Sequence, residues 1–143
     1  MDFTWYFDQT KINWNELSEL YRIAPLGTKL PADLEIVFTN SRFKCFVYQD
    51  DSLIGVGRAL ADGKDCSYIC DIAVHPEYQG LGLGKEIVQN LVQLSQGHRK
   101  IILYASPGKE GFYAILGFKK MNTAMAIFQN EAKMMKNGTI SEP

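Results

Sequence analysis

Hydrophobic and polar positions along the chain follow two periods, one typical of strands and one typical of helices. Residues 68–74 and 100–105 are short, nearly continuous apolar runs of the kind that forms buried strands. Between them, an amphipathic helix is predicted by the apolar side chains Ile87, Val88, Leu91, Val92 and Leu94. His75-Pro76 ends the first run, because proline cannot donate to a strand ladder. The pattern predicts a strand, a loop, a helix and a second strand.

The remaining elements are predicted from the same periods, from helix caps and from turn residues. They are a strand at 3–7, a helix capped by Asn13, a helix after Pro31, strands at 43–48 and 53–61, a helix at 111–118 ended by Gly117, and a strand at 123–128. Residues 136–143 are expected to fray. The order β-α-α-β-β-β-α-β-α-β predicts an α+β fold, a mixed sheet flanked by helices, in one domain of residues 1–143.

Composition and charge narrow the function classes. The chain has 143 residues, 46% of them hydrophobic and 22% charged, with a net charge of −1. This near-neutral balance gives no general attraction to nucleic acid or to anionic membranes. The N-terminus lacks the pattern of a signal peptide, and no apolar run approaches the length of a membrane span. We expect a cytoplasmic protein that binds neither nucleic acid nor membrane and that could form a homodimer.

The cysteines and histidines do not suggest a metal site or a disulfide. Cys66 and Cys70 would lie on one strand, about 13 Å apart at about 3.3 Å per residue, which is too far to bridge. The only histidines are His75 and His98, and no metal-ligand spacing is present. We interpret all three cysteines as structural, with Cys70 the one nearest the candidate site.

Three alternate glycines, Gly80, Gly82 and Gly84, follow the strand predicted at 68–74 and lead directly into the helix that contains Ile87. Glycine lets the backbone approach a ligand closely, and a helix N-terminus offers unpaired N–H groups to an anion. Lys85 is followed by Glu86 rather than by Ser or Thr, which argues against a nucleotide-binding P-loop. The spacing also differs from the dinucleotide fingerprint. The loop therefore indicates another phosphate-bearing ligand, although a tight turn that binds nothing remains an alternative.

Two blocks of this sequence resemble the GNAT superfamily of acyl-CoA-dependent N-acyltransferases. The first, residues 72–84, ends in the pattern Q/R-x-x-G-x-G/A, and the second, residues 112–118, matches F-Y-x-x-x-G-F. The resemblance implies the GNAT fold, acetyl-CoA as cosubstrate with no metal, and an amine acceptor that is a small molecule, of the kind used by bacterial enzymes.

The resemblance also implies which residues bind acetyl-CoA. The pyrophosphate would lie on the loop and on the first amides of the helix, and the pantetheine arm would lie beside the preceding strand where the sheet splays open. The expected contacts are Ile72, Ala73, Val74, Gln79, Gly80, Leu81, Gly82, Leu83, Gly84, Lys85, Ser106 and Tyr113. Ser106 stands where the family often has asparagine, so its contact departs from the family pattern.

Acyl transfer to an amine needs a group that removes a proton and a group that assists thiolate departure. Asp71 is the candidate base, directly or through water, and Tyr113 resembles the tyrosine that donates to the leaving thiolate. Asp71 could equally bridge the sheet, and Tyr113 could be a core tyrosine. Asp65, Glu77 and Glu110 are lesser candidates for the base.

The acceptor cleft is the least defined part of the sequence. Gly55 and Gly57 lie inside a predicted strand and indicate a bulge or a close backbone approach, with Arg58 bordering the cleft. An aromatic wall could come from Trp5, Tyr6, Trp14, Tyr21 and Tyr68, most of which we expect in the core. Two other functions stay open: acetylation of a protein lysine or N-terminus, and a non-catalytic CoA-binding interaction domain.

Overall fold

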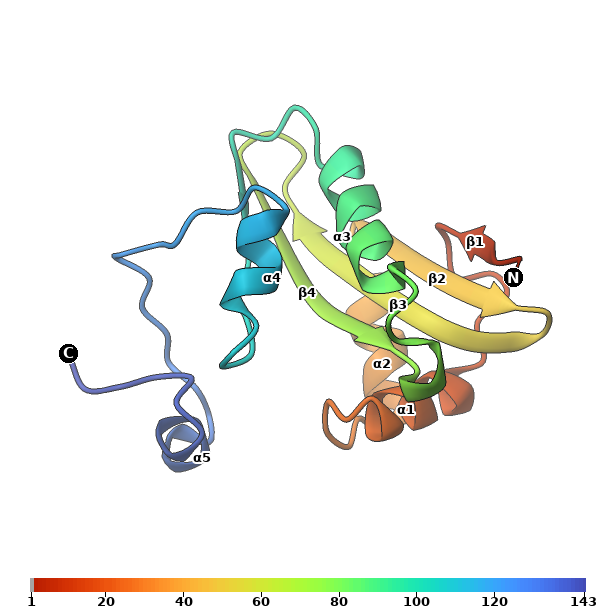
Figure 1. Ribbon diagram of the computed structural model, residues 1–143, viewed down its shortest axis with the longest axis horizontal. Helices are drawn as coiled ribbons and strands as arrows, with labels where there is room; N and C mark the ends of the chain where they lie inside the picture. Colours follow the sequence, from red (N-terminus) through yellow and green to blue (C-terminus); the bar gives the residue numbers. More distant parts are fainter. Residues whose placement is uncertain (1) are drawn as a thin grey trace. The chain divides into compact units, whose positions relative to one another are not determined.

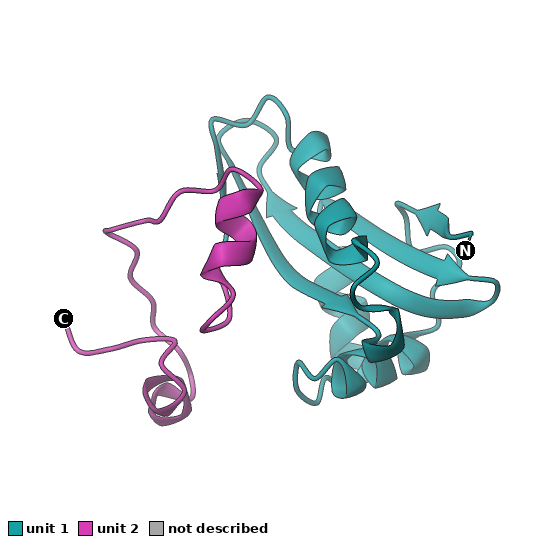
Figure 2. Cartoon of the chain, in the orientation of Figure 1, with its two compact units in different colours: residues 1–103 teal, residues 104–143 magenta. Residues whose placement is uncertain are grey.

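The structure of the protein, a computed structural model, describes residues 2–143. The chain forms two compact units, one ending at Leu103 and the other running from Tyr104 to Pro143 (Figure 2). We describe each unit by itself, and the single domain expected from the sequence stays a prediction. Within the described residues, every helix is too short or too polar to cross a bilayer.

Unit 1 contains a five-stranded mixed sheet in the order β1-β2-β3-β4-β5 (Figure 1). The strands are β1 (Thr4–Tyr6), β2 (Phe43–Gln49), β3 (Ser52–Ala61), β4 (Cys66–Val74) and β5 (Lys100–Ile102). Neighbouring strands from β1 to β4 are antiparallel, whereas β4 and β5 are parallel. The parallel pair follows from the helical crossover between β4 and β5. The predicted mixed sheet flanked by helices is confirmed.

Helices cover both faces of this sheet (Figure 1). Helices α1 (Trp14–Ile23) and α2 (Pro31–Thr39) lie on one face, and α3 (Leu83–Leu94) lies on the other. The Asn13 side chain accepts a hydrogen bond from Glu16 N at 3.0 Å, so the predicted cap of α1 is confirmed. The buried side of α3 is made by Leu83, Ile87, Val88 and Leu91, while Leu94 is exposed.

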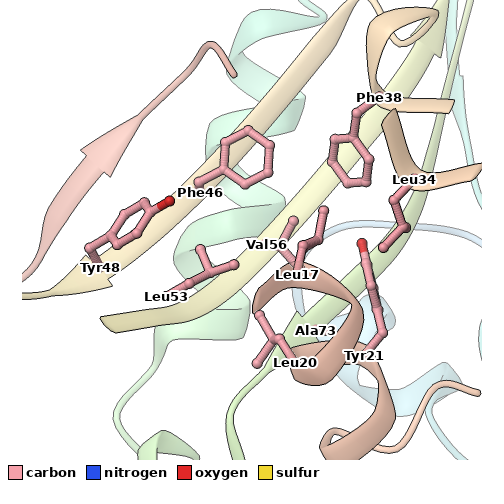
Figure 3. Close-up of a cluster of buried hydrophobic side chains, with 10 residues drawn as sticks. All are labelled: Leu17, Leu20, Tyr21, Leu34, Phe38, Phe46, Tyr48, Leu53, Val56 and Ala73. Carbon is pink, nitrogen blue, oxygen red and sulfur yellow. The ribbon is translucent and has the colours of Figure 1, made fainter. Parts of the chain in front are cut away.

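The main hydrophobic core lies between the sheet and helices α1 and α2 (Figure 3). Its largest buried side chains include Tyr21, Phe38 and Phe46, and the Phe38 and Phe46 rings lie 5.4 Å apart. Val56 and Ala73 bring β3 and β4 into the same cluster. The core therefore fixes the C-terminal end of β4 against α1, two residues after the candidate base Asp71.

Unit 2 contains α4 (Glu110–Ile115) and α5 (Glu131–Lys136). Gly117 follows α4 at a φ of +98°, and its N–H donates to Ala114 O at 3.1 Å, which confirms its predicted place after the helix end. The strand predicted at 123–128 is wrong, because these residues form no ladder. Unit 2, all of which the structure describes, holds no other strand that could pair with them, and an apolar pattern alone does not make a strand. The strand predicted at 100–105 is shorter than expected, because only residues 100–102 pair with β4.

Candidate active site

The glycine loop has the geometry of an anion cradle. Gly80 and Gly82 adopt left-handed conformations, with φ of +82° and +80°, and a Cβ atom at either position would meet nothing within 4 Å. The open side of both residues is therefore available to a ligand. The loop is tied to β4, because the Gln79 side-chain amide donates to Val74 O at 3.3 Å. The predicted contact of Gln79 with acetyl-CoA stays a prediction.

The loop leads directly into the N-terminus of α3. Gly82 is the N-cap and brings no side chain to the first turn. The N–H of Glu86 donates to Gly82 O at 3.0 Å, which begins the regular helical ladder. The amides of residues 83–85 precede that ladder, so they have no acceptor within the helix. Together with the helix dipole they form a site that suits a phosphate group.

Strand β4 has a free edge that ends at this loop. Strand β5 pairs with it only from Cys66 to Tyr68, while β4 continues to Val74. Residues 69–74 therefore face no β5 partner, and their outward N–H and C=O groups can pair with an extended ligand. Ile72, Ala73 and Val74, which were predicted to line the pantetheine arm, all lie on this free edge. Within unit 1, β4 therefore runs past the end of its pairing with β5. The contacts predicted for the pantetheine arm stay predictions.

A β-bulge lies within this free edge of β4. Val56 lies opposite Ala73 and Arg58 lies opposite Cys70, so Asp71 and Ile72 together oppose Gly57 alone. Asp71 has a φ of +56°, which is uncommon for a residue other than glycine and is found mostly at functional sites and turns. The bulge predicted from the strand glycines is confirmed, and Asp71 is its extra residue.

Gly57 allows α3 to approach the sheet at the bulge. A Cβ atom there would lie 2.7 Å from Ile72 Cδ1 and from Ile87 Cγ2, and 2.9 Å from Leu91 Cδ1. Real Cβ atoms do not tolerate such distances, so a side chain would push α3 away. The close backbone approach predicted at this position is therefore also confirmed.

The Asp71 carboxylate is held by two cations. Arg58 Nε donates to Asp71 Oδ2 at 2.8 Å, and Lys29 Nζ lies 3.7 Å from Asp71 Oδ1. The Arg58 side chain is 13% exposed and also donates through Nη1 to Ser41 Oγ at 3.2 Å. Asp71 thus bridges two strands through Arg58, as the structural alternative predicted, while Oδ1 faces only the more distant ammonium.

Tyr21 supports Asp71 from the core. Its hydroxyl donates to the Asp71 backbone carbonyl oxygen at 2.8 Å (its side chain is drawn in Figure 3). Burial, reinforced by the negative charge of Asp71, raises the pKa of Tyr21 well above its ordinary value, so the hydroxyl keeps its proton. A protonated tyrosine at this place fixes the backbone of the bulge. Tyr21 is therefore a core residue and not part of an exposed aromatic wall.

Unit 2 carries the other predicted site residues, Tyr113 and Ser106. The Tyr113 ring lies on α4 and makes edge-to-face contacts with Phe112, at 5.0 Å between centroids, and with Phe118, at 6.0 Å. Burial raises the pKa of Tyr113, so its hydroxyl is a proton donor at neutral pH. Ser106 lies in the turn before α4, where its carbonyl oxygen accepts from Lys109 N at 2.9 Å. Their assigned roles stay predictions.

Two of the lesser candidates for the base, Asp65 and Glu110, have structural partners of their own. Asp65 pairs with Lys100 at 2.8 Å and with Arg99 at 3.7 Å, near the start of β4. Glu110 Oε1 accepts from Gly108 N at 3.0 Å and shapes the turn before α4. Glu77 lies in a short 3-10 helix, Pro76–Tyr78, at the other end of β4. Asp71 alone among these carboxylates lies at the bulge.

Two of the three cysteines, Cys45 and Cys70, have thiols whose pKa is raised by burial. Burial raises the pKa of Cys45 to about 12 and that of Cys70 to about 11, so both are protonated and weakly nucleophilic at neutral pH. All three cysteines are free thiols. Within residues 2–143, no three His, Cys, Asp or Glu side chains gather closely enough to hold a metal ion.

Sequence reasoning missed Lys29, which lies in the loop between α1 and α2. No hydrophobic period or motif marks this residue, because its place depends on how that loop folds over β4. The one available signal was its cationic side chain close to the N-terminal end of the Pro31 helix, and it did not point to Asp71.

Comparison with known proteins places these features in a family. The model of the acetyltransferase (GNAT) family matches residues 8–118. The uncharacterized N-acetyltransferase ycf52 of Porphyra purpurea is 43% identical over 122 residues, which is 80% of this chain and 70% of that protein. The chloroplastic serotonin N-acetyltransferase 2 of rice (Oryza sativa subsp. japonica) is 40% identical over 67 residues, covering 46% of this chain and 34% of that protein.

Solved structures with the same fold include several acetyltransferases. A probable acetyltransferase from meticillin-resistant Staphylococcus aureus aligns with a TM-score of 0.80 at 23% identity, covering 89% of this chain and 98% of that one. The enzyme AAC(6′)-Iy, solved with a CoA-containing bisubstrate analogue, aligns with a TM-score of 0.68 at 16% identity, covering 90% of this chain and 99% of that one. The family match, the shared fold and the glycine loop at the end of β4 agree, and the chain belongs to the GNAT family of acetyltransferases.

Proposed function

We propose that this chain transfers an acetyl group from acetyl-CoA to a primary amine of a small molecule, by direct attack of the amine on the thioester. The observation that carries the proposal is the junction of two features in unit 1. The free edge of β4 ends at a glycine loop whose open side leads into the N-terminus of α3. An extended arm with a pyrophosphate at one end matches this junction in shape and charge.

The residues present suit acetyl-CoA. Gly80 and Gly82 leave room for phosphate oxygens, and the amides of residues 83–85 can donate to them. Ile72, Ala73 and Val74 offer backbone groups to the amides of the pantetheine arm. When bound, acetyl-CoA supplies an activated acetyl group as a thioester. The chain binds acetyl-CoA and removes a proton from the amine.

Deprotonation of the acceptor is the first chemical requirement. An alkylamine with a pKa near 10.4 is only about 0.04% neutral at pH 7, which corresponds to about 4.6 kcal/mol. We assign Asp71 to this role, because its Oδ1 is turned from the bulge toward the face that carries α1 and α2. Arg58 fixes the other oxygen, so the carboxylate has one orientation.

Assistance to the leaving thiolate is the second requirement. We assign it to the Tyr113 hydroxyl, whose raised pKa keeps it protonated and able to donate. We assign the Ser106 side chain to a hydrogen bond with the pantetheine arm of the cofactor. The assignment of Tyr113 rests on the match of residues 112–118 to the family pattern, and that of Ser106 rests on its position, where the family often has asparagine.

A small primary amine is the acceptor class that we favour. The partly matching rice protein is named for serotonin, an arylalkylamine, and the AAC(6′)-Iy complex carries an acetylneamine group, so both names refer to amines of small molecules. In this chain, a carboxylate beside the Tyr21 ring would suit an ammonium group.

Release of free CoA thiol tests the proposal. Purified protein is incubated with acetyl-CoA and a panel of acceptors: arylalkylamines, polyamines, aminoglycosides, and peptides with a free N-terminus or a lysine. We expect acceptor-dependent thiol release with at least one small amine. Turnover with the peptides alone would favour a protein acetyltransferase. Tight binding of acetyl-CoA without turnover of any acceptor would indicate a CoA-binding interaction domain and contradict the proposal.

A further inference from the structure

Lys29 brings a primary amine of the chain itself to the proposed base. Its Nζ lies 3.7 Å from Asp71 Oδ1 and 5.3 Å from the centroid of the Tyr21 ring. A carboxylate oxygen and an aromatic face are the two groups that recognise an alkylammonium ion. The Lys29 side chain is 29% exposed, so its ammonium is partly enclosed yet still open to a reagent.

Both partners in this contact are fixed by the fold. Ser18 Oγ, on α1, donates to the Lys29 carbonyl oxygen at 2.5 Å and holds the loop between α1 and α2. Asp71 is held by Arg58 through Oδ2 and by Tyr21 through its backbone carbonyl. These contacts leave Oδ1 as the oxygen that faces an incoming cation, and Lys29 Nζ already lies there.

The same place is where the proposed function puts the acceptor amine. The free edge of β4 begins beyond Cys66–Tyr68, and the bulge at Asp71 lies on it, next to Ile72, the first predicted pantetheine contact. An amine paired with Asp71 Oδ1 is therefore at the base and beside the expected thioester. In the unliganded chain that amine belongs to Lys29.

We infer that Lys29 occupies the acceptor-amine position and is itself acetylated within the same molecule when acetyl-CoA is bound without an external acceptor. This inference rests on the proposed acetyl transfer. Lys29 Nζ, after giving one proton through Asp71 to solvent, forms a bond with the acetyl carbon. The carbon–sulfur bond breaks and its electron pair leaves on sulfur. The thiolate takes the second proton lost by nitrogen, so the products are N-acetyl-Lys29, free CoA thiol and one proton.

Site-resolved mass spectrometry tests the inference. The full chain is incubated with acetyl-CoA and no acceptor, and each lysine is followed with time. Lys11 is the matched internal control, because its Nζ lies 5.3 Å and 5.5 Å from two tyrosine centroids and 4.0 Å from a carboxylate, that of Asp51, without lying at the bulge. We expect Lys29 to be acetylated at least about tenfold faster than Lys11, because its amine is already oriented.

The kinetics separate reaction within the chain from reaction between chains. The rate at Lys29 should not change with protein concentration, Asp71→Asn should slow it, and Lys29→Arg should remove the modification without changing acetyl-CoA affinity. If thiol is released with an added amine while Lys29 reacts no faster than Lys11, the inference is wrong and the proposed function stands. If acetyl-CoA binds but neither Lys29 nor any added amine is acetylated, both are wrong.

A binding measurement without acetyl-CoA tests the occupancy directly. Phenethylamine is titrated into the unmodified protein, Lys29→Met and Lys11→Met. If Lys29 fills the ammonium position, its removal raises the fraction of binding-competent protein, and Lys29→Met should bind phenethylamine at least about threefold more tightly than the unmodified protein. Lys11→Met should bind it as the unmodified protein does. Equal affinities in all three proteins would overturn the inference.

Discussion

Single residues carry the proton transfers of the proposed reaction, and the two assigned groups have different surroundings. Asp71 is a carboxylate between cations, at the extra residue of a bulge. Tyr113 is a phenol between Phe112 and Phe118, and burial raises its pKa. A carboxylate oxygen can accept a proton, and a phenol that stays protonated can donate one. The two environments therefore suit opposite roles.

Tyr113→Phe tests the donor role. The change removes the hydroxyl and leaves the ring, so folding and acetyl-CoA affinity should remain nearly unchanged. Positioned acid–base groups contribute about 10²- to 10⁴-fold, and we expect kcat to fall by at least about tenfold. Single-turnover kinetics with acceptor in excess measure this step without interference from product release. An unchanged single-turnover rate would remove Tyr113 from the mechanism.

Site residues were predictable from the sequence to different degrees. The loop glycines were identified because their spacing requires a close backbone approach, and Gly80 and Gly82 do have positive φ. Asp71 was identified by its place on the strand, but its left-handed backbone was not, because a bulge depends on the register between two strands. The contact of Lys29 with Asp71 depends on a loop that carries no periodic signal.

Among the elements, α3 and the bulged half of β4 depend on each other through Gly57. The short distances from a Cβ at this position to Ile72, Ile87 and Leu91 show that the helix packs directly on the strand backbone. Because α3 also carries the amides that would bind pyrophosphate, the position of this helix on the sheet determines where the anion cradle lies. Packing and ligand binding are linked through one glycine.

Gly57→Ala tests this packing. Overpacking a well-filled core costs about 1–3 kcal/mol, and we expect a loss in this range in the free energy of unfolding. Gly55→Ala is the matched control, since its Cβ would lie 3.1 Å from Ile87 Cδ1 and 3.3 Å from Val47, where small shifts relieve the contact. Chemical denaturation of both variants should show the larger loss for Gly57→Ala. Equal stabilities would mean that α3 can move without cost.

Elements were easier to predict where local signals and tertiary partners agree. The Asn13 cap, and the turn residues that bound β2 and β3, gave boundaries within a residue or two of those observed. Residues 123–128 have the pattern of a strand but no ladder, since pairing depends on a neighbour that the pattern does not specify. The helix at Glu131–Lys136 was also missed, because it is short and its apolar positions are few.

At the scale of the whole molecule, unit 1 holds the features that would bind the cofactor, and unit 2 holds the tyrosine assigned to the leaving group. A ligand that binds only the folded chain stabilises it by about 2.7 kcal/mol at a concentration 100 times its Kd. Acetyl-CoA should therefore raise the melting temperature without added metal. The central claim is that its binding depends on the backbone of the glycine loop.

Titration calorimetry of acetyl-CoA into Gly82→Val tests that claim most directly. Gly97→Val is the control: Gly97 follows the other end of α3, has a φ of +94° and also has nothing within 4 Å of its Cβ position. Valine strains the backbone at both sites, but only at Gly82 does it stand over the proposed phosphate position. We predict that Gly82→Val weakens acetyl-CoA binding at least about tenfold and that Gly97→Val binds as the unmodified protein does. Equal affinity in the two variants would contradict the account.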